Sequence, residues 1–211
     1  MTEASALRRS VVAVLALAAL VLVTLFMTSN RVLPWLGGEP ANRFHGRDVT
    51  SEDWAADFSL SDASGKVRTL SDFRGRVVLL SFGYTHCPDV CPTTLAKFAE
   101  VRLLLGADAQ RVQAIFVTVD PARDSAQVLR AYVPNFDSSF IGLRGTPAQT
   151  DAAVRSFHAS YQVIERQGQV EVDHTASTYV IDERGNTRIV TPYDQSARAL
   201  ADDVLVLLRQ G

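Results

Sequence analysis

Both cysteines of the 211-residue chain lie in one short, proline-containing segment, in which three residues separate Cys87 from Cys91. A spacer of this length can bring two sulfurs together, either in a disulfide or as two ligands of one metal ion. The two methionines are Met1 at the N-terminus and Met27 in an apolar run. Any site for a soft metal must therefore use Cys87 and Cys91. Two buried, inert cysteines are the alternative, and their clustering argues against it.

The cysteine segment lies between a predicted strand and a predicted helix. Residues 77–82 form a continuous apolar run, which is typical of a strand buried on both faces. Residues 93–105 repeat apolar side chains at helical spacing, and Pro92 suits the first helical position. Reactive groups gather where strands of open α/β sheets end, so this segment is a candidate site. We expect the positive end of the helix dipole to favour the thiolate form of the cysteines.

A histidine far along the chain is the third candidate. His174 precedes a predicted strand at residues 177–181. If that strand runs antiparallel to the first, its start lies at the edge of the sheet that carries the cysteines. A lone histidine is more often a surface or capping residue, so spacing alone leaves its role open. His86 is interpreted as a neighbour of the site or a solvent-facing residue, and His45 and His158 have no motif around them.

Three aspartates are candidates for side chains that surround the ligands. Asp89 lies between the cysteines, Asp173 precedes His174, and Asp120 ends a second predicted buried strand. Asp120 belongs to residues 118–124, for which a proline turn followed by a helix cap is the simpler interpretation. A carboxylate at that position could still tune the site electrostatically.

The remaining periodicities predict the elements that must position these residues. A hairpin turns at residues 62–65, a second buried strand covers 112–120, and a helix capped by Asp124, with Gln127 three positions on, covers 124–133. Further predicted elements are a helix at 147–160, an exposed hairpin at 162–172, strands at 177–181 and 187–190, and a helix at 196–209. This order is typical of a thioredoxin-like α/β fold, a central mixed sheet flanked by helices, with an added N-terminal hairpin.

An uncharged run near the N-terminus predicts a membrane anchor. Residues 10–30 contain no charge and would extend about 31 Å as a helix, enough to cross a hydrocarbon core. A cleaved signal peptide is the alternative, although its apolar region is usually shorter. We expect a cytoplasmic segment at 1–9, the transmembrane helix at 10–30, a linker at 31–49 and one domain at 50–211. In a bacterium, the inner membrane would then hold the domain in the periplasm.

Composition limits the classes of function. Hydrophobic residues make up 47% of the chain and charged residues 21%, which suits one globular domain. The formal net charge is −2. Without a basic surface, nucleic acid is not an expected partner.

Three motifs resemble one known family. FGYTHCPDVCP at 82–92, TVDPARD at 118–124 and DHTAS at 173–177, in this order behind an anchor, look like the Sco/SenC family of copper-binding cytochrome c oxidase assembly factors. The similarity covers roughly residues 50–209. It implies a thioredoxin-like fold and one copper ion bound by Cys87, Cys91 and His174.

The resemblance also implies a function. Two thiolates and an imidazole suit Cu(I), or Cu(II) with an added oxygen ligand, and Zn(II) would fit them too. A redox-active disulfide between Cys87 and Cys91 would prevent binding. We therefore expect a copper metallochaperone, with no catalytic residues, that delivers copper to the CuA site of a cytochrome c oxidase subunit. A periplasmic copper donor and a thiol reductant are the further expected partners.

Three alternatives have different requirements. Thioredoxin-type oxidoreductases, which could reduce the cysteines of the CuA site, use C-x-x-C and a cis-proline, where this chain has C-x3-C and His174. Peroxiredoxins place Thr three and Pro seven residues before the reactive cysteine, and neither Cys87 nor Cys91 has both. A membrane-tethered redox or copper sensor would use the same site.

Overall fold

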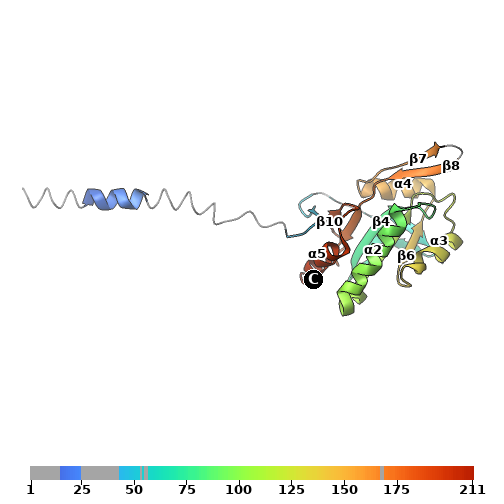
Figure 1. Cartoon of the computed structure of the whole chain (residues 1–211), viewed down its shortest axis with the longest axis horizontal. Helices are drawn as coiled ribbons and strands as arrows, with labels where there is room; N and C mark the ends of the chain where they lie inside the picture. The colour runs from blue at the N-terminus through green and yellow to red at the C-terminus, as the bar shows by residue number, and fades with distance from the viewer. Residues whose placement is uncertain (1–14, 25–42, 53, 55–56, 167–168) are drawn as a thin grey trace, which may run out of the picture. The chain divides into compact units, whose positions relative to one another are not determined.

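The computed structural model describes residues 15–24, 43–52, 54, 57–166 and 169–211, which fall into two units, residues 1–42 and 43–211 (Figure 1). In the first unit, residues 15–24 form an exposed helix. Over the described ranges, no helix combines the length and the apolar character that crossing a membrane requires. The predicted anchor at 10–30 lies partly outside the described residues.

A mixed sheet forms the centre of the second unit. Its strand order is β1-β10-β9-β4-β5-β6-β2-β3. The strands are β1 (Arg47–Asp48), β2 (Ser59–Asp62), β3 (Val67–Thr69), β4 (Val77–Gly83), β5 (Val112–Thr118), β6 (Ile141–Arg144), β9 (Thr178–Ile181) and β10 (Thr187–Thr191). Strands β4, β5 and β6 are parallel neighbours, and β9 pairs antiparallel with β4. The predicted mixed sheet and the added hairpin, β2–β3, are confirmed.

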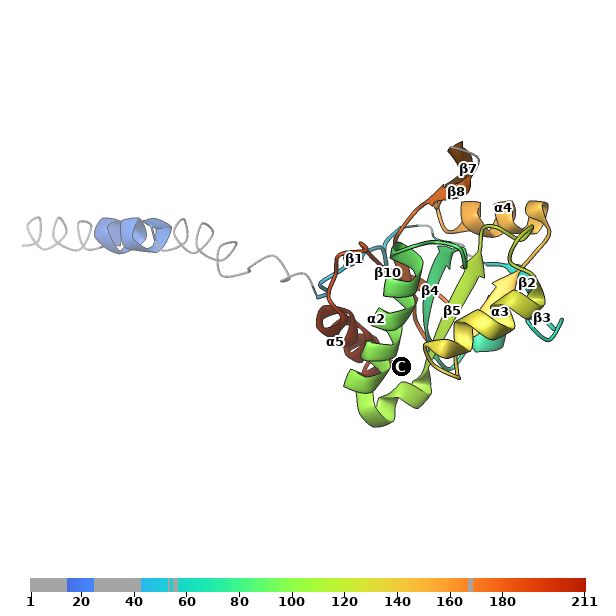
Figure 2. The same cartoon turned by 45° about the vertical axis from the view of Figure 1, so that its right-hand side comes forward.

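Helices cover both faces of this sheet. The helical elements are η1 (Leu70–Phe73), α2 (Val90–Leu105), η2 (Gly106–Arg111), α3 (Ala126–Tyr132), η3 (Val133–Asn135), α4 (Pro147–Ser156) and α5 (Ala197–Leu208). Helices α2 and α5 pack against each other and against β4 (Figure 2). A side chain at Gly83 would point towards Cys91 of α2. Successive residues of a strand point to opposite faces, so Phe82 points away from α2. Its ring packs on Phe157 at the end of α4.

A separate hairpin lies beyond the end of β4. It consists of β7 (Tyr161–Arg166) and β8 (Gln169–His174), which pair with each other as a two-stranded sheet. Figures 1 and 2 both show it near the start of α2. The hairpin predicted at 162–172 is confirmed, and its second strand continues to the candidate ligand His174.

The structure differs from the predicted elements in the cap of one helix and in one additional strand. Helix α3 is capped by Ser125, whose hydroxyl accepts a hydrogen bond from Val128 N at 3.2 Å, so the prediction of Asp124 as the cap was wrong. Asp124 is buried and its carboxylate is used inside the fold, as described below. Strand β6 was not predicted, because four residues are too few to show a period.

Residues 43–49, predicted as the end of a linker, belong to the folded unit. Phe44 and Val49 are buried, and β1 pairs with β10. The buried carboxylate of Asp203 accepts hydrogen bonds from His45 N at 2.6 Å and Gly46 N at 3.0 Å. These contacts attach the segment to α5.

Asp203→Ala is expected to lower the free energy of unfolding by about 2–3 kcal/mol, because it leaves buried backbone donors unpaired. Chemical denaturation measures the change. Asp202→Ala is the matched control, since the Asp202 side chain is about half exposed, at 46%, and lies 4.0 Å from the His45 side chain. Equal effects of the two substitutions would contradict the structural role of Asp203.

Candidate metal centre

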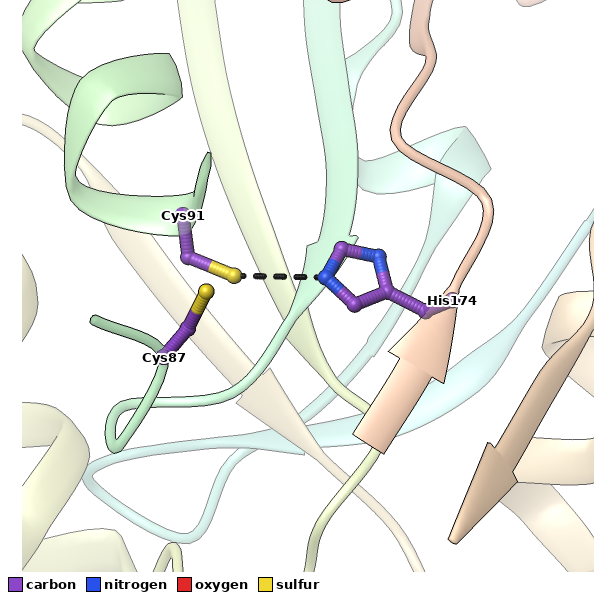
Figure 3. A group of neighbouring side chains, drawn as sticks. All are labelled: Cys87, Cys91 and His174. Carbon is purple, nitrogen blue, oxygen red and sulfur yellow. Dashed lines mark hydrogen bonds between the residues drawn. The ribbon is translucent and has the colours of Figure 1, made fainter. Parts of the chain in front are cut away.

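The two cysteines and His174 converge at the carboxyl end of β4. The ligand atoms of Cys87, Cys91 and His174 all lie within 4.8 Å of one another. Cys91 Sγ is 3.4 Å from His174 Nε2, and both side chains point into the same space (Figure 3). Both cysteines are free thiols. The arrangement is that of a site with two sulfur donors and one nitrogen donor.

The topology explains why residues so far apart in sequence meet here. Cys87 lies in the loop after β4, and Cys91 is the second residue of α2. Thr178, which begins β9, pairs with Ser81 near the end of β4, so the chain enters β9 at the edge where the cysteine loop begins. His174 ends β8 just before this point. The antiparallel strand expected from the sequence is confirmed.

The imidazole of His174 is oriented for ligation through Nε2. Its Nδ1 lies 3.1 Å from the carbonyl oxygen of Thr175, and because a carbonyl can only accept, Nδ1 carries the proton. Nε2, beside Cys91 Sγ, then has a free lone pair. Burial lowers the pKa of His174, which favours the neutral form that binds metals.

The environment of Cys91 overrides the expected effect of the helix dipole. Cys91 is 2% exposed, and burial raises the pKa of its thiol, with smaller contributions from Cys87 and Asp124. The expectation that the helix N-terminus favours a thiolate is wrong for this residue, because desolvation of the charge is the larger effect. Cys91 is therefore a neutral thiol at neutral pH, while Cys87 is half-buried at the rim of the site.

This protonation state makes metal binding dependent on pH. A metal ion bound by Cys91 must displace its proton, so binding at pH 7 is expected to release about one proton from this residue. The apparent dissociation constant should fall about tenfold per pH unit for each proton released. Proton release in a weakly buffered solution and chelator competition between pH 6 and 8 measure these quantities. Cys91→Ser is the control, and pH-independent affinity in the wild type would contradict the prediction.

Close packing holds Cys91 against the sheet. A Cβ atom at Gly83 would lie 2.7 Å from Cys91 Sγ and 2.7 Å from Cε2 of Phe116. Only glycine lets the buried sulfur sit this close to β4. Gly83 was not among the predicted site residues, although it precedes the cysteine loop in the FGYTHC motif.

The predicted surrounding aspartates have different environments. Asp89 is exposed, and its carboxylate accepts a hydrogen bond from the Thr93 hydroxyl at 3.2 Å. Asp173 is also exposed and acts on the His174 pKa as a nearby charge. Asp120 is buried and forms an ion pair with Arg123. Asp120 is thus the one of the three that is held inside the fold.

Asp124 supports the cysteine loop through hydrogen bonds to its carboxylate. This fully buried carboxylate accepts hydrogen bonds from the Thr118 hydroxyl at 2.5 Å and from Thr85 N at 3.0 Å. It therefore joins the end of β5 to the loop that carries Cys87. Thr85 and Thr118 lie 33 positions apart in the sequence, so a carboxylate that binds both is not visible as a sequence pattern.

The other histidines do not join the group within the described residues. His86 is exposed, and its Nδ1 lies 3.2 Å from the Thr85 hydroxyl. His158 packs against Trp54 with ring centroids 4.5 Å apart and an interplanar angle of 41°. His45 contacts α5, as described above.

A mixed sheet with helices on both faces and a Cys-Cys-His group at the end of its central strand defines a thioredoxin-like protein with a candidate metal centre. The family model SCO1/SenC matches residues 47–209. The chain belongs to the Sco/SenC family, as its motifs indicated.

Curated relatives agree with this assignment. The mitochondrial protein SCO2 homolog of Bos taurus is 39% identical over 147 residues, which cover 68% of this chain and 54% of the bovine protein. The human SCO2 homolog is 36% identical over 155 residues, covering 70% of this chain and 57% of that protein. The chain thus spans little more than half the length of these relatives.

Solved structures show the same fold. Bradyrhizobium japonicum ScoI with copper bound is 35% identical, with a TM-score of 0.66 over 72% of this chain and 98% of that chain. Apo Sco1 from Thermus thermophilus is 38% identical, with a TM-score of 0.70 over 78% of this chain and 96% of that chain.

The donor set of this chain fits copper. Two sulfurs and one oriented imidazole nitrogen are soft to intermediate donors that suit Cu(I) in low coordination. Together with the copper-bound ScoI structure, the Cys-Cys-His group supports copper as the metal of this centre.

Proposed function

We propose that this protein is a membrane-anchored copper metallochaperone. It binds one copper ion through Cys87, Cys91 and His174 and delivers it to the CuA site during cytochrome c oxidase assembly. The observation that carries the proposal is the convergence of the three ligand atoms within 4.8 Å of one another.

The unequal exposure of the two sulfurs suits transfer. Cys91 is buried against β4, whereas Cys87 is half-buried in the loop. A thiolate of the acceptor can approach copper from the side of Cys87 and form a new sulfur–copper bond before the bond to Cys87 breaks. Copper then moves by ligand exchange without being released to water, and Cys91 and His174 are the last ligands to leave.

The same thiols connect the proposed delivery to redox state. Oxidation of Cys87 and Cys91 to a disulfide removes two electrons and both sulfur donors, so loading requires a thiol reductant. Reduction of the CuA cysteines by this dithiol is the second candidate function. Disulfide reduction does not require the His174 nitrogen that lies 3.4 Å from Cys91 Sγ, whereas a metal site does, which makes copper delivery the better supported function. A sensor role uses the same chemistry and rests on no separate observation.

The proposed topology follows from the uncharged run at residues 10–30. A single-pass anchor in the bacterial inner membrane, with the N-terminus in the cytoplasm, holds the metal centre in the periplasm beside the oxidase. A periplasmic copper donor would load the centre there.

Transfer to the acceptor tests the proposal. The full-length protein in detergent, loaded with one equivalent of Cu(I), is mixed with a reduced, metal-free CuA domain, and the copper content of each is measured after separation. Most of the copper is expected on the CuA domain, and retention by the donor would contradict delivery. In a parallel experiment with an oxidised CuA domain, wild-type and Cys87→Ser proteins that release thiols at equal rates would exclude the reductase function.

A further inference from the structure

The guanidinium of Arg123 joins the loop after β5 to the hairpin that carries His174. Its Nε donates a hydrogen bond to the buried carboxylate of Asp120, in the same loop. Its Nη1 donates to the carbonyl oxygen of Val170, in β8, at 2.8 Å. The guanidinium is therefore bound to Asp120 through Nε and to the backbone of the hairpin through Nη1.

The same guanidinium lies over Tyr84, which packs on the candidate ligand. Arg123 Cζ is 5.7 Å from the centroid of the Tyr84 ring, a distance typical of a cation–π contact. The Tyr84 ring meets the His174 imidazole edge-on, with centroids 6.1 Å apart and an interplanar angle of 90°. Tyr84 also interacts with the backbone of Val172 in β8 and with Cys87. Arg123 thus supports a side chain that contacts both the cysteine loop and the hairpin.

The position of the hairpin depends on such contacts because it does not pair with the central sheet. At its base, Thr175 N donates to Ser160 O at 2.9 Å, and the Tyr161 hydroxyl donates to Asp151 at 2.6 Å. Further along β8, the contact of Arg123 with Val170 lies four residues from His174. A hairpin held only at its base can tilt, and a tilt moves His174 relative to the cysteines.

One nitrogen of the Arg123 guanidinium is buried without a hydrogen bond to the described part of the chain, so other contacts must stabilise this position of the side chain. Its Nη2 is buried and has no hydrogen-bond partner among the described residues. An unpaired buried donor is unfavourable, and the ring of Tyr84 and the carboxylate of Asp120 offset that cost. Lysine cannot replace these contacts together, because its single ammonium lacks the planar fork that reaches the carboxylate and the carbonyl at once.

We propose that Arg123 is the positioning residue of the metal centre: it fixes the β7–β8 hairpin so that His174 faces Cys87 and Cys91. The proposal rests on the metal centre of the proposed function for its effect on copper, but its effect on the hairpin exists in the metal-free protein. Arg123 does not touch the metal, and it acts through His174 and Tyr84.

Hydrogen exchange in the metal-free, full-length protein tests the structural part. Arg123→Ala is expected to increase amide exchange of residues 161–174 while exchange in β4 and β5 stays as in the wild type. Arg123→Lys should give an intermediate increase, and it also serves if the alanine variant does not fold. Arg130→Ala is the matched control, because Arg130 contacts the carbonyl of Ala63 instead of the hairpin. Unchanged exchange of residues 161–174 in Arg123→Ala and Arg123→Lys would overturn the proposal.

Chelator competition for Cu(I) tests the functional part. Arg123→Ala is expected to lower Cu(I) affinity about tenfold, as is usual for residues that orient metal ligands. In a His174→Ala background the same substitution should have no further effect, because its action depends on His174. An equal loss in both backgrounds would overturn the proposal. If His174→Ala alone had no effect, the ligand assignment of the proposed function would fail, and the hydrogen-exchange result would still decide the role of Arg123.

Discussion

His174→Ala is expected to lower the affinity of the reduced protein for Cu(I) at least about a hundredfold, or by ~3 kcal/mol or more. The substitution removes the one nitrogen donor of the group, whose Nε2 lies 3.4 Å from Cys91 Sγ. It also removes an imidazole whose tautomer is already set by the Thr175 carbonyl, so no reorganisation is required in the wild type. Competition with a Cu(I) chelator of known affinity measures the loss.

His86→Ala is the matched control for this measurement. His86 is next to Cys87 in sequence but is exposed and outside the Cys-Cys-His group. Its removal is expected to change Cu(I) affinity by less than about threefold, well under the usual cost of a lost metal-orienting contact. If His174→Ala and His86→Ala retained copper equally well, His174 would not be a ligand, and the metallochaperone proposal would lose its main support.

Gly83→Ala is expected to lower both the free energy of unfolding and the affinity for copper. The added methyl group would lie 2.7 Å from Cys91 Sγ and 2.7 Å from the Phe116 ring, and neither neighbour has room to retreat, because both are buried. Overpacking of this kind costs about 2–3 kcal/mol. Because Cys91 Sγ is one of the two atoms displaced, Cu(I) affinity should fall about tenfold or more, as for other changes that move a metal ligand.

Gly142→Ala separates these two effects. Gly142 lies in β6, where an added Cβ would be 3.1 Å from a Val133 side-chain atom and 3.3 Å from Leu129. This variant is expected to lose stability without losing copper affinity. Chemical denaturation and chelator competition on both variants make the comparison. Full copper affinity in a folded but destabilised Gly83→Ala protein would show that the position of Cys91 is not critical for binding.

Some residues of the candidate site could be predicted from the sequence and others could not. Cys87 and Cys91 are the only two cysteines of the sequence and are separated by three residues. The sequence alone therefore predicts that they belong to one site. His174 was open on spacing alone and was selected by the resemblance of three motifs. Asp124 was predicted as a helix cap, because a short polar residue before a helical run satisfies a local rule. Its actual contacts are to Thr85, in the loop after β4, and to Thr118, at the end of β5.

The sequence by itself determined the α/β fold class and the donor types of the centre. The fold class follows from the periodicity of apolar residues along β4 and α2, and the donor types follow from the residue types in the motifs. The tertiary structure alone decided the protonation of Cys91, the need for glycine at position 83 and the link from Arg123 to the hairpin. These depend on burial and on atoms from distant segments that approach within a few ångströms. A helix N-terminus favours a thiolate and burial opposes it, and only the packed fold determines which of the two effects is larger.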